Sequence, residues 1–359
     1  MKVTPLTLRK KIALELWRQR EANIRSMHPL RQLFWECTLR CDLHCRHCGS
    51  DCKMQPEHKD MPKEVFFRVL DSVAAKTDPH EVFIIVSGGE PLMRRDIEEC
   101  GAEFRRRGFP WGMVSNGLHL TPERFRSLVQ AGMGSITISL DGLEDDHNWM
   151  RGNEQSFRMV SQAIDMLVDK GDVLFDIVTC VNRRNYPKLD DIKHFLIDKG
   201  VKRWRLFTVF PVGRAAHDPN MRLTNEEFRG VFDFIKHTRE EGLIRADYGC
   251  EGFLGNYEGE VRNRFFSCQA GVTVGSVMCD GAISACTSLR ADYHQGNIYH
   301  DDFMEVWESR FQPYRNREWM RRDECADCRY FRYCRGGGMH LRDNNGKLLL
   351  CHLHRLQET

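Results

Sequence analysis

Residues 37–52 read CTLRCDLHCRHCGSDC, a stretch that places five cysteines within sixteen residues. Only Cys41, Cys45 and Cys48 give a complete Cys-x3-Cys-x2-Cys series, and they directly follow a predicted strand at residues 33–36. Three thiolates from one loop can bind three irons of a cubane cluster and leave the fourth iron open to another ligand. The series therefore predicts a reactive iron-sulfur cluster at the end of the first strand.

A zinc site is the alternative for the same loop. Zinc would need a fourth ligand, which His44, His47 or Cys52 could supply. A fourth protein ligand would block the open position that a reaction requires, so the iron-sulfur interpretation is preferred. Cys37 and Cys52 are then expected to be bystanders, with Cys37 packed beneath the loop.

Outward from this loop, short β-branched or aromatic runs alternate with longer segments of helical period. This alternation is typical of repeated strand-helix units, whose parallel sheet curls into all or part of a barrel. The predicted strands are residues 33–36, 81–86, 111–114, 135–140, 174–181 and 203–209, and the predicted helices include 62–75, 96–107, 122–131, 157–170 and 189–199. The expected fold is α/β, a partial (βα)6 TIM-type barrel with its chemistry at the carboxyl edge of the strands.

The chain is expected to divide into three parts. Residues 1–30 form an N-terminal extension with one basic amphipathic helix at 6–24, in which Ile12, Leu14, Leu16 and Trp17 are available for packing. Docking on the barrel is the preferred role for this helix, and a membrane surface or a partner is the alternative. Residues 31–245 form the barrel. Residues 246–359 form a small cysteine-rich α+β domain with short strands, glycine-rich turns and a helical stretch near 303–315.

Composition narrows the class of protein. Among 359 residues, 53 Lys and Arg stand against 51 Asp and Glu, so no bulk charge attracts nucleic acid. No apolar run of about 20 residues and no signal segment is present, so no membrane span is expected and the cytoplasm is the predicted location. Fifteen cysteines in such a chain favour metal ligation over disulfides.

Polar and glycine residues follow the next three strands. The second strand ends in Gly88, Gly89 and Glu90, the third in Ser115 and Asn116, and the fourth in Ser139. Glycines allow close backbone approach, and the carboxylate can accept a hydrogen bond from an ammonium group. Hydroxyl and amide groups at adjacent strand ends suit a ribose or an amino-acid moiety. These residues predict a cofactor pocket beside the cluster.

On these motifs the chain resembles radical S-adenosylmethionine (SAM) enzymes. The resemblance implies that the open iron is chelated by the methionine moiety of SAM, and that reductive cleavage yields a deoxyadenosyl radical that abstracts hydrogen from a substrate. It also implies that Gly88, Gly89 and Glu90 bind the amino group, and that Ser139 and Arg151 contact the cofactor. The residue before the last motif cysteine is usually aromatic in this family, and here it is His47.

The C-terminal cysteines resemble a SPASM domain, which carries auxiliary iron-sulfur clusters in radical enzymes that act on peptides. By that resemblance one four-thiolate site consists of Cys325, Cys328, Cys334 and Cys351. The other retains Cys268 and Cys286 and lacks one ligand, because Gly338 stands where the pattern has cysteine. Cys250 is the preferred replacement ligand and Cys279 the second choice, since thiolates suit iron. One or two auxiliary clusters are expected, and a structural zinc ribbon is the alternative.

The resemblance implies a maturase-type enzyme that modifies a peptide or protein side chain, and it extends to maturases paired with small lipoproteins. The implied partners are a precursor peptide or protein and a reducing electron donor such as flavodoxin or ferredoxin. Tetrapyrrole side-chain chemistry is the alternative enzyme function, because radical enzymes of the haem pathway share this architecture. A non-catalytic iron-sulfur or zinc scaffold is the alternative from another class.

Overall fold

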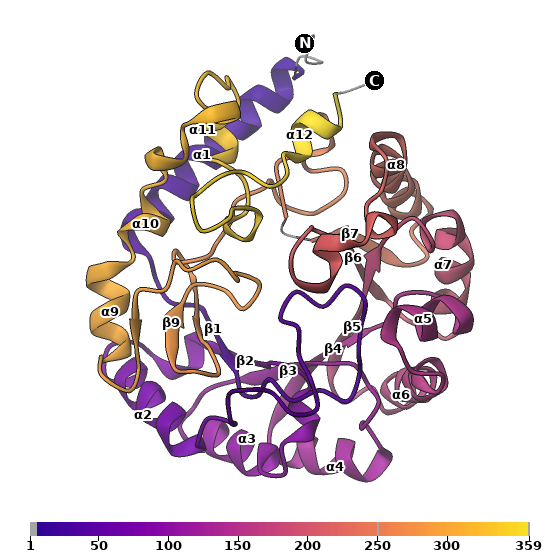
Figure 1. Cartoon of the computed structure of the whole chain (residues 1–359), viewed down its shortest axis with the longest axis vertical. Coiled ribbons are helices and arrows are strands. Elements are labelled where there is room, and N and C mark those ends of the chain that lie inside the picture. The colour runs from indigo at the N-terminus through magenta and orange to yellow at the C-terminus, as the bar shows by residue number, and fades with distance from the viewer. Residues whose placement is uncertain (1–5, 250, 358–359) are drawn as a thin grey trace.

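The computed structural model describes residues 6–249 and 251–357, and its central sheet follows the predicted order. Six consecutive parallel strands lie side by side around the ring seen in Figure 1. They are β1 (Gln32–Glu36), β2 (Phe83–Ser87), β3 (Trp111–Ser115), β4 (Met133–Ser139), β5 (Leu174–Val181) and β6 (Arg203–Thr208). The prediction of an α/β fold with a parallel, barrel-like sheet is confirmed.

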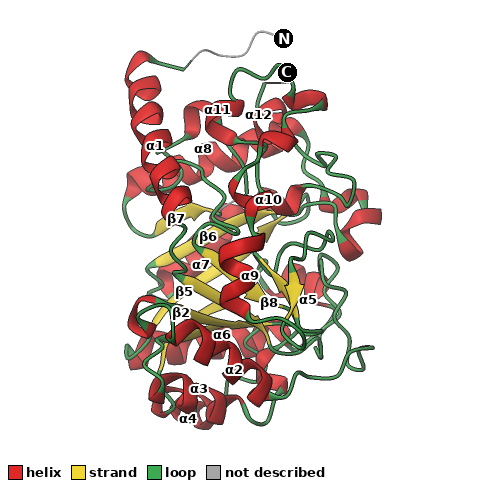
Figure 2. Cartoon of the chain, turned by 90° about the vertical axis from the view of Figure 1, so that its left-hand side faces the viewer, coloured by secondary structure: helices red, strands yellow, loops and turns green. Residues whose placement is uncertain are grey.

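Helices cover the outside of the ring (Figures 1 and 2). They are α2 (Lys63–Ala74), α3 (Ile97–Arg106), α4 (Pro122–Gln130), α5 (Glu144–Arg151), α6 (Ser156–Lys170), α7 (Leu189–Asp198) and α8 (Asn225–Glu241). The sequence analysis did not single out α5 and α8. For α8 a readable signal existed, because Thr224 and Glu227 form a capping box at its start.

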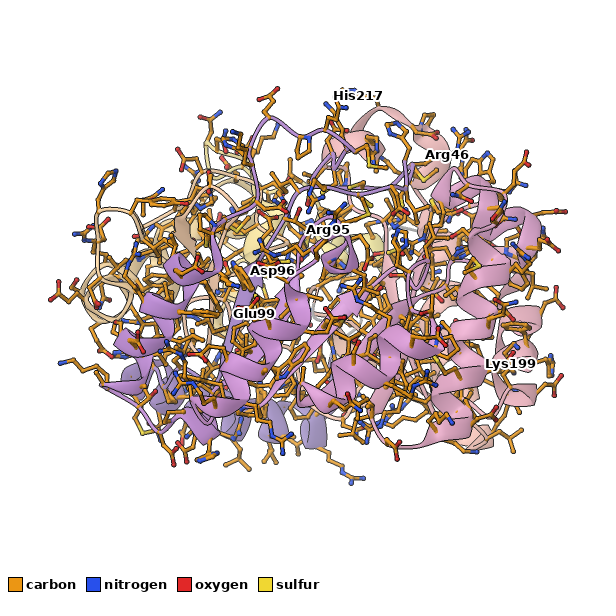
Figure 3. All side chains as sticks on the ribbon, turned by 90° about the horizontal axis from the view of Figure 1, so that it is seen from below. Arg46, Arg95, Asp96, Glu99, Lys199 and His217 are labelled. Atoms are coloured by element: carbon orange, nitrogen blue, oxygen red, sulfur yellow. The ribbon has the colours of Figure 1, made fainter. Side chains whose placement is uncertain are left out.

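Alternation along each strand decides which side chains face the helices and which face the inside of the ring. In β5, Ile177, Thr179 and Val181 are fully buried, whereas Cys180 lies between them on the opposite face. The carboxyl ends of β1 to β5 meet at one edge of the sheet, as in other parallel barrels. In Figure 3, Arg46 and His217 lie at one edge of the molecule and Lys199, at the end of α7, lies away from them.

The sheet continues beyond the six predicted strands on both sides. β7 (Arg245–Tyr248) pairs in parallel with β6, across the predicted boundary after residue 245. On the other side β8 (Val274–Val277) pairs in parallel with β1, and β9 (Ala282–Ser284) and β10 (Gly296–Asn297) follow it as antiparallel strands. The C-terminal region therefore shares the sheet of the barrel. The division into three parts remains a prediction.

The C-terminal region contributes α9 (Phe303–Arg310), α10 (Gln312–Arg315), α11 (Phe331–Cys334) and α12 (His352–Arg355). α9 and α10 lie within the single helical stretch that the sequence predicted near residues 303–315. In Figure 1 these helices follow the left and upper rim of the ring.

The N-terminal helix α1 (Leu8–Met27) packs on this C-terminal region rather than on the barrel helices. The hydroxyl of Tyr333 donates to Glu15 over 2.7 Å, and Leu14 is buried with an exposed fraction of 2%. The expectation that Ile12 and Leu16 also pack is wrong, because their exposed fractions are 56% and 66%. Leu14 lies about 200° around the helix from each of them, so one face cannot bury all three.

None of the helices in residues 6–249 and 251–357 combines the length and the apolar character needed to cross a lipid bilayer.

Candidate active site

The three motif cysteines lie in one pocket at the carboxyl edge of the sheet. The pocket has a volume of about 600 Å³, including space open to solvent. Its lining includes most of the predicted cluster and cofactor residues, namely Cys41, Cys45, Cys48, His47, Gly88, Gly89, Ser115, Asn116, Ser139 and Arg151. Three thiols beside glycine backbone, hydroxyl and amide groups fit an iron-sulfur cluster that binds a nucleoside amino acid.

The two glycines after β2 are required by the protein's own backbone. Gly88 has a φ of 149°, and a Cβ atom there would lie 2.2 Å from the carbonyl oxygen of Thr38. A Cβ atom at Gly89 would lie 2.2 Å from the carbonyl oxygen of Arg40. The N–H of Gly89 donates to Thr38 and that of Glu90 donates to Arg40, both over 2.8 Å. Glycine therefore lets the second strand end directly against the start of the cysteine loop.

Glu90 is fully buried and does not line the pocket. Its carboxylate accepts hydrogen bonds from the Ser115 hydroxyl (2.8 Å), the Asn116 N–H (2.7 Å) and the Leu92 N–H (3.1 Å). Burial raises the pKa of this carboxyl group, although the three donors oppose that rise. Through these hydrogen bonds Glu90 holds Ser115 and Asn116 in place at the pocket wall. Its predicted contact with the cofactor stays a prediction.

Arg151 reaches the pocket from the last turn of α5 and forms a buried ion pair. Its Nη2 lies 2.7 Å from Oδ2 of Asp141, and its Nη1 lies 3.7 Å from the sulfur of Cys45. Burial disfavours the ionised Asp141, but Arg151 and then His47 outweigh it, so the pKa of Asp141 lies below its ordinary value. The carboxylate therefore holds the guanidinium beside the cysteine loop.

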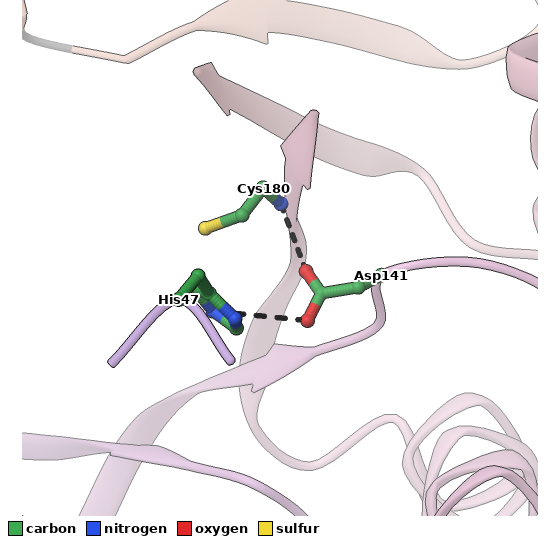
Figure 4. Close-up of side chains that lie close together, drawn as sticks. All are labelled: His47, Asp141 and Cys180. Atoms are coloured by element: carbon green, nitrogen blue, oxygen red, sulfur yellow. Dashed lines mark hydrogen bonds and ion pairs between the residues drawn. The ribbon is translucent and has the colours of Figure 1, made fainter. Parts of the chain in front are cut away.

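His47, Asp141 and Cys180 gather at the same place, as Figure 4 shows. Their ligand atoms lie within 4.8 Å of one another, which would suit a metal ion. Two features oppose a cation there. The Asp141 carboxylate is already paired with Arg151, and burial raises the pKa of the Cys180 thiol well above its ordinary value. We therefore do not assign these three residues as a metal site; Nε2 of His47 lies 3.8 Å from Oδ2 of Asp141.

Arg214, which the sequence did not predict as a site residue, lines the pocket from the segment after β6. Its Nε donates to the carbonyl oxygen of Cys45 over 2.7 Å, and its Nη1 donates to Asp51 (2.8 Å) and to the carbonyl oxygen of Cys52 (3.2 Å). Its own N–H donates to the carbonyl oxygen of Cys48. No local pattern reveals this role, because the contacts join segments far apart in the chain.

Two polar residues at the end of β5, Thr179 and Asn182, have structural partners. The Thr179 hydroxyl donates to the carbonyl oxygen of Leu140 and accepts from the indole of Trp204. The Asn182 side chain accepts from the N–H of Arg184 within a turn. Thr179 therefore connects neighbouring strands, and Asn182 stabilises a turn.

The second cysteine site lies in the C-terminal region. Cys325, Cys328, Cys334 and Cys351 line one pocket of about 470 Å³. Its walls include the apolar side chains of Phe253, Phe331, Leu341, Leu348, Leu350 and Leu353. The Nη2 of Arg342 lies 3.5 Å from the Cys325 sulfur. Four thiols in an apolar pocket with a nearby cation fit a four-thiolate cluster, whose charge is negative.

The first auxiliary site is only partly assembled in the described residues. Burial, with a smaller contribution from the nearby Cys268, raises the pKa of the Cys286 thiol. Cys279 has different surroundings, since its sulfur lies 3.6 Å from the carbonyl oxygen of Lys59. The preferred replacement, Cys250, lies outside the described residues.

The structure explains why residue 338 is glycine. A Cβ atom on Gly338 would lie 2.6 Å from the carbonyl oxygen of Glu251. The neighbouring segment therefore occupies the space that a cysteine side chain at this position would need.

Comparison with known proteins gives two domain matches. Residues 35–196 match the family model of the radical SAM superfamily, and residues 268–329 match the SPASM model, described as an iron-sulfur cluster-binding domain. The first match includes Cys41, Cys45 and Cys48, and the second includes Cys268, Cys286, Cys325 and Cys328 and ends before Cys334.

Relatives named for different activities match most of this chain. The AdoMet-dependent heme synthase of Nitratidesulfovibrio vulgaris is 26% identical over 322 residues, which cover 84% of this chain and 85% of the relative. The mycofactocin maturase MftC of Mycolicibacterium smegmatis is 27% identical over 317 residues, which cover 86% and 77%.

Solved structures share the fold. The structure of anSMEcpe with bound AdoMet has a TM-score of 0.72 at 20% identity, covering 92% of this chain and 95% of that chain. Streptococcus suis SuiB bound to S-adenosylmethionine has a TM-score of 0.70 at 16% identity, covering 90% and 77%.

Proposed function

The chain is a radical SAM enzyme with a C-terminal SPASM domain, and on this basis we propose that it abstracts hydrogen from a side chain of a peptide or protein substrate. The observation that carries the proposal is the pocket in which Cys41, Cys45 and Cys48 lie beside Gly88, Gly89 and the polar ends of β3 and β4.

The cysteine loop would hold the catalytic [4Fe-4S] cluster, and the neighbouring strand ends would hold SAM. When bound, this pair supplies a deoxyadenosyl radical by one-electron cleavage of the sulfonium. Ser139 from β4, Ser115 and Asn116 from β3, and His47 from the loop offer hydrogen bonds and a ring face to the cofactor. Arg151, held by Asp141, places positive charge beside Cys45. These residues would thus bind and orient the cofactor.

The C-terminal cysteines would hold auxiliary clusters. Cys325, Cys328, Cys334 and Cys351 are proposed as the ligands of one cluster, supported by the pocket that they line together. Cys268, Cys286 and Cys250 are proposed for the other, with one protein ligand fewer than four. A cluster with an open position could bind substrate or receive the electron left on a product radical.

The proposed substrate class is peptidic. The relatives named mycofactocin maturase and the resemblance to peptide-modifying enzymes support it. Tetrapyrrole side-chain chemistry is the second candidate, and the relatives named heme synthase favour it.

The first experiment tests the radical chemistry. We would reconstitute the protein anaerobically with iron and sulfide, reduce it with dithionite and measure deoxyadenosine formed from SAM. The control replaces Cys41, Cys45 and Cys48 together by Ala. We expect deoxyadenosine from the native protein alone. Absence of product from native protein that carries its clusters would refute the proposed chemistry.

A second experiment separates the substrates. Deoxyadenosine formation would be measured in two separate reactions. One contains iron coproporphyrin, and the other contains a short peptide encoded beside this gene. Stimulation and a mass change of the peptide would support the maturase function. Consumption of the porphyrin with loss of carboxyl groups would instead establish the tetrapyrrole function.

A further inference from the structure

The loop that carries the motif cysteines is closed at its base. The N–H of Cys41 donates to the carbonyl oxygen of Lys53 over 3.0 Å, and Arg40 and Lys53 form a parallel bridge. Because the two ends of the loop are joined, Cys52 lies next to the start of the motif although eleven residues separate it from Cys41.

Cys52 is directed into the same pocket as the three motif cysteines. Its exposed fraction is 3%, and it belongs to one buried cluster with Cys41 and Cys45, against which Cys48 packs. It lines the pocket together with all three. The expectation that Cys52 is a bystander therefore does not describe its position.

Cys37, another cysteine of the barrel, has different surroundings from Cys52. Cys37 is fully buried among core residues and is absent from the pocket lining. The carbonyl group of Cys37 accepts from Nη1 of Arg94, and that guanidinium lies over the ring of Trp35. Burial alone therefore does not bring a cysteine to the pocket, and the placement of Cys52 is specific to the closed loop.

Charge in the pocket would accommodate a fourth thiolate. Arg214 binds the carbonyl oxygens of Cys45 and Cys52, and Arg151 lies beside the Cys45 sulfur. Both guanidinium groups line the pocket. Each guanidinium also pairs with a carboxylate, Arg151 with Asp141 and Arg214 with Asp51, so the two cations offset only part of the negative charge that four thiolates bring to a cluster.

We propose that Cys52 is a displaceable fourth ligand of the cluster bound by Cys41, Cys45 and Cys48. Before SAM binds, the Cys52 thiolate occupies the iron that the motif leaves open. When SAM binds, its amino and carboxylate groups form two bonds to that iron, the iron-sulfur bond to Cys52 breaks, and the thiolate takes up a proton. No electron is transferred in this exchange. The inference rests on the proposed function of the loop.

Removal of Cys52 has two expected effects. The open iron of a three-cysteine cluster is the one exposed to oxidative loss, so the Cys52→Ala protein without SAM should give a several-fold larger [3Fe-4S] signal by electron paramagnetic resonance after mild ferricyanide oxidation. Because SAM no longer competes with a thiolate, its dissociation constant should fall several-fold, measured by anaerobic equilibrium dialysis. Added SAM should bring the signals of the two proteins together.

Two further variants keep the test decisive. Cys100→Ala, a change in α3 away from the pocket, should match the native protein in both measurements. Cys52→Ser keeps an oxygen that binds iron more weakly than a thiolate does, and should lie between native and Cys52→Ala. Equal signals and equal SAM affinity in native and Cys52→Ala proteins would overturn the inference. So would complete loss of iron from the motif, because Cys52 would then be obligatory rather than displaceable.

These outcomes are separable from the test of the proposed function. If native protein forms no deoxyadenosine, the radical chemistry fails whatever Cys52 does. If native protein forms deoxyadenosine and the Cys52 variants behave like it in both measurements, only the inference about Cys52 fails.

Discussion

Arg214 donates a hydrogen bond from Nε to the carbonyl oxygen of Cys45 over 2.7 Å, although 169 residues separate the two in the chain. The same guanidinium reaches Asp51 and the carbonyl oxygen of Cys52. A cysteine loop without regular secondary structure is thus fixed from the far side of the barrel. Preorganised ligands of this kind are what a cluster site needs.

We predict that Arg214→Ala weakens the cluster site. Hydrogen bonds from a charged donor are worth about 1.5–3 kcal/mol each. Since about 1.4 kcal/mol corresponds to a factor of ten in binding, SAM affinity should fall about tenfold or more. Arg214→Lys should recover only part, because lysine lacks the planar fork. Iron content and SAM binding are the measurements.

The control for this prediction is Arg183→Ala, which removes a half-exposed arginine paired with Glu227. It should retain native iron content and affinity. Native values in Arg214→Ala as well would show that the loop is ordered without this clamp.

We predict that Asp141→Asn destabilises the protein more than the loss of an exposed carboxylate from a surface ion pair does. Removing one partner of a buried ion pair typically costs about 3–5 kcal/mol, because the other charge stays buried and unpaired. Here the unpaired group would be Arg151. Urea unfolding followed by tryptophan fluorescence measures the change. Asp165→Asn, which removes an exposed partner of Lys199, should cost less than about 1 kcal/mol. Equal small effects would contradict the assignment of a buried pair.

We predict that Gly338→Cys does not create a fourth ligand at the first auxiliary site. Its Cβ atom would meet the carbonyl oxygen of Glu251 at 2.6 Å, so the neighbouring backbone would have to move. Overpacking of this kind typically costs about 1–3 kcal/mol. The melting temperature should therefore fall while the iron content stays unchanged. Gly134→Ala, where the nearest atom would be 3.8 Å away, is the tolerated control. A gain of iron at unchanged stability would contradict this expectation.

We predict that the two leucines of α1 differ in their contribution to stability. Leu14→Ala removes a buried side chain from the contact with the C-terminal region and should cost about 2–5 kcal/mol. Leu16→Ala alters an exposed side chain and should change stability by no more than about 0.5 kcal/mol. Thermal unfolding of the two variants checks the difference. A similar loss for both would mean that Leu16 is covered in solution.

The sequence by itself determined the chemistry and the class of fold. The spacing of Cys41, Cys45 and Cys48 after a strand is a local property, and so are the glycines after β2 and the alternation of strands and helices. These signals can be read from the sequence because a loop directly follows its strand along the chain, whatever the tertiary arrangement. For the same reason the predicted ends of the six parallel strands lie within about two residues of the observed ends.

Only the tertiary structure decided which distant groups complete the site. It directed Glu90 toward Ser115 and Asn116, paired Arg151 with Asp141, and brought Arg214 and Cys52 to the pocket. It also joined β8 to β1, so that the C-terminal cysteines belong to a region continuous with the barrel sheet. These relationships depend on the order of strands around the ring and on which face each side chain takes. The spacing along the chain carries no record of either.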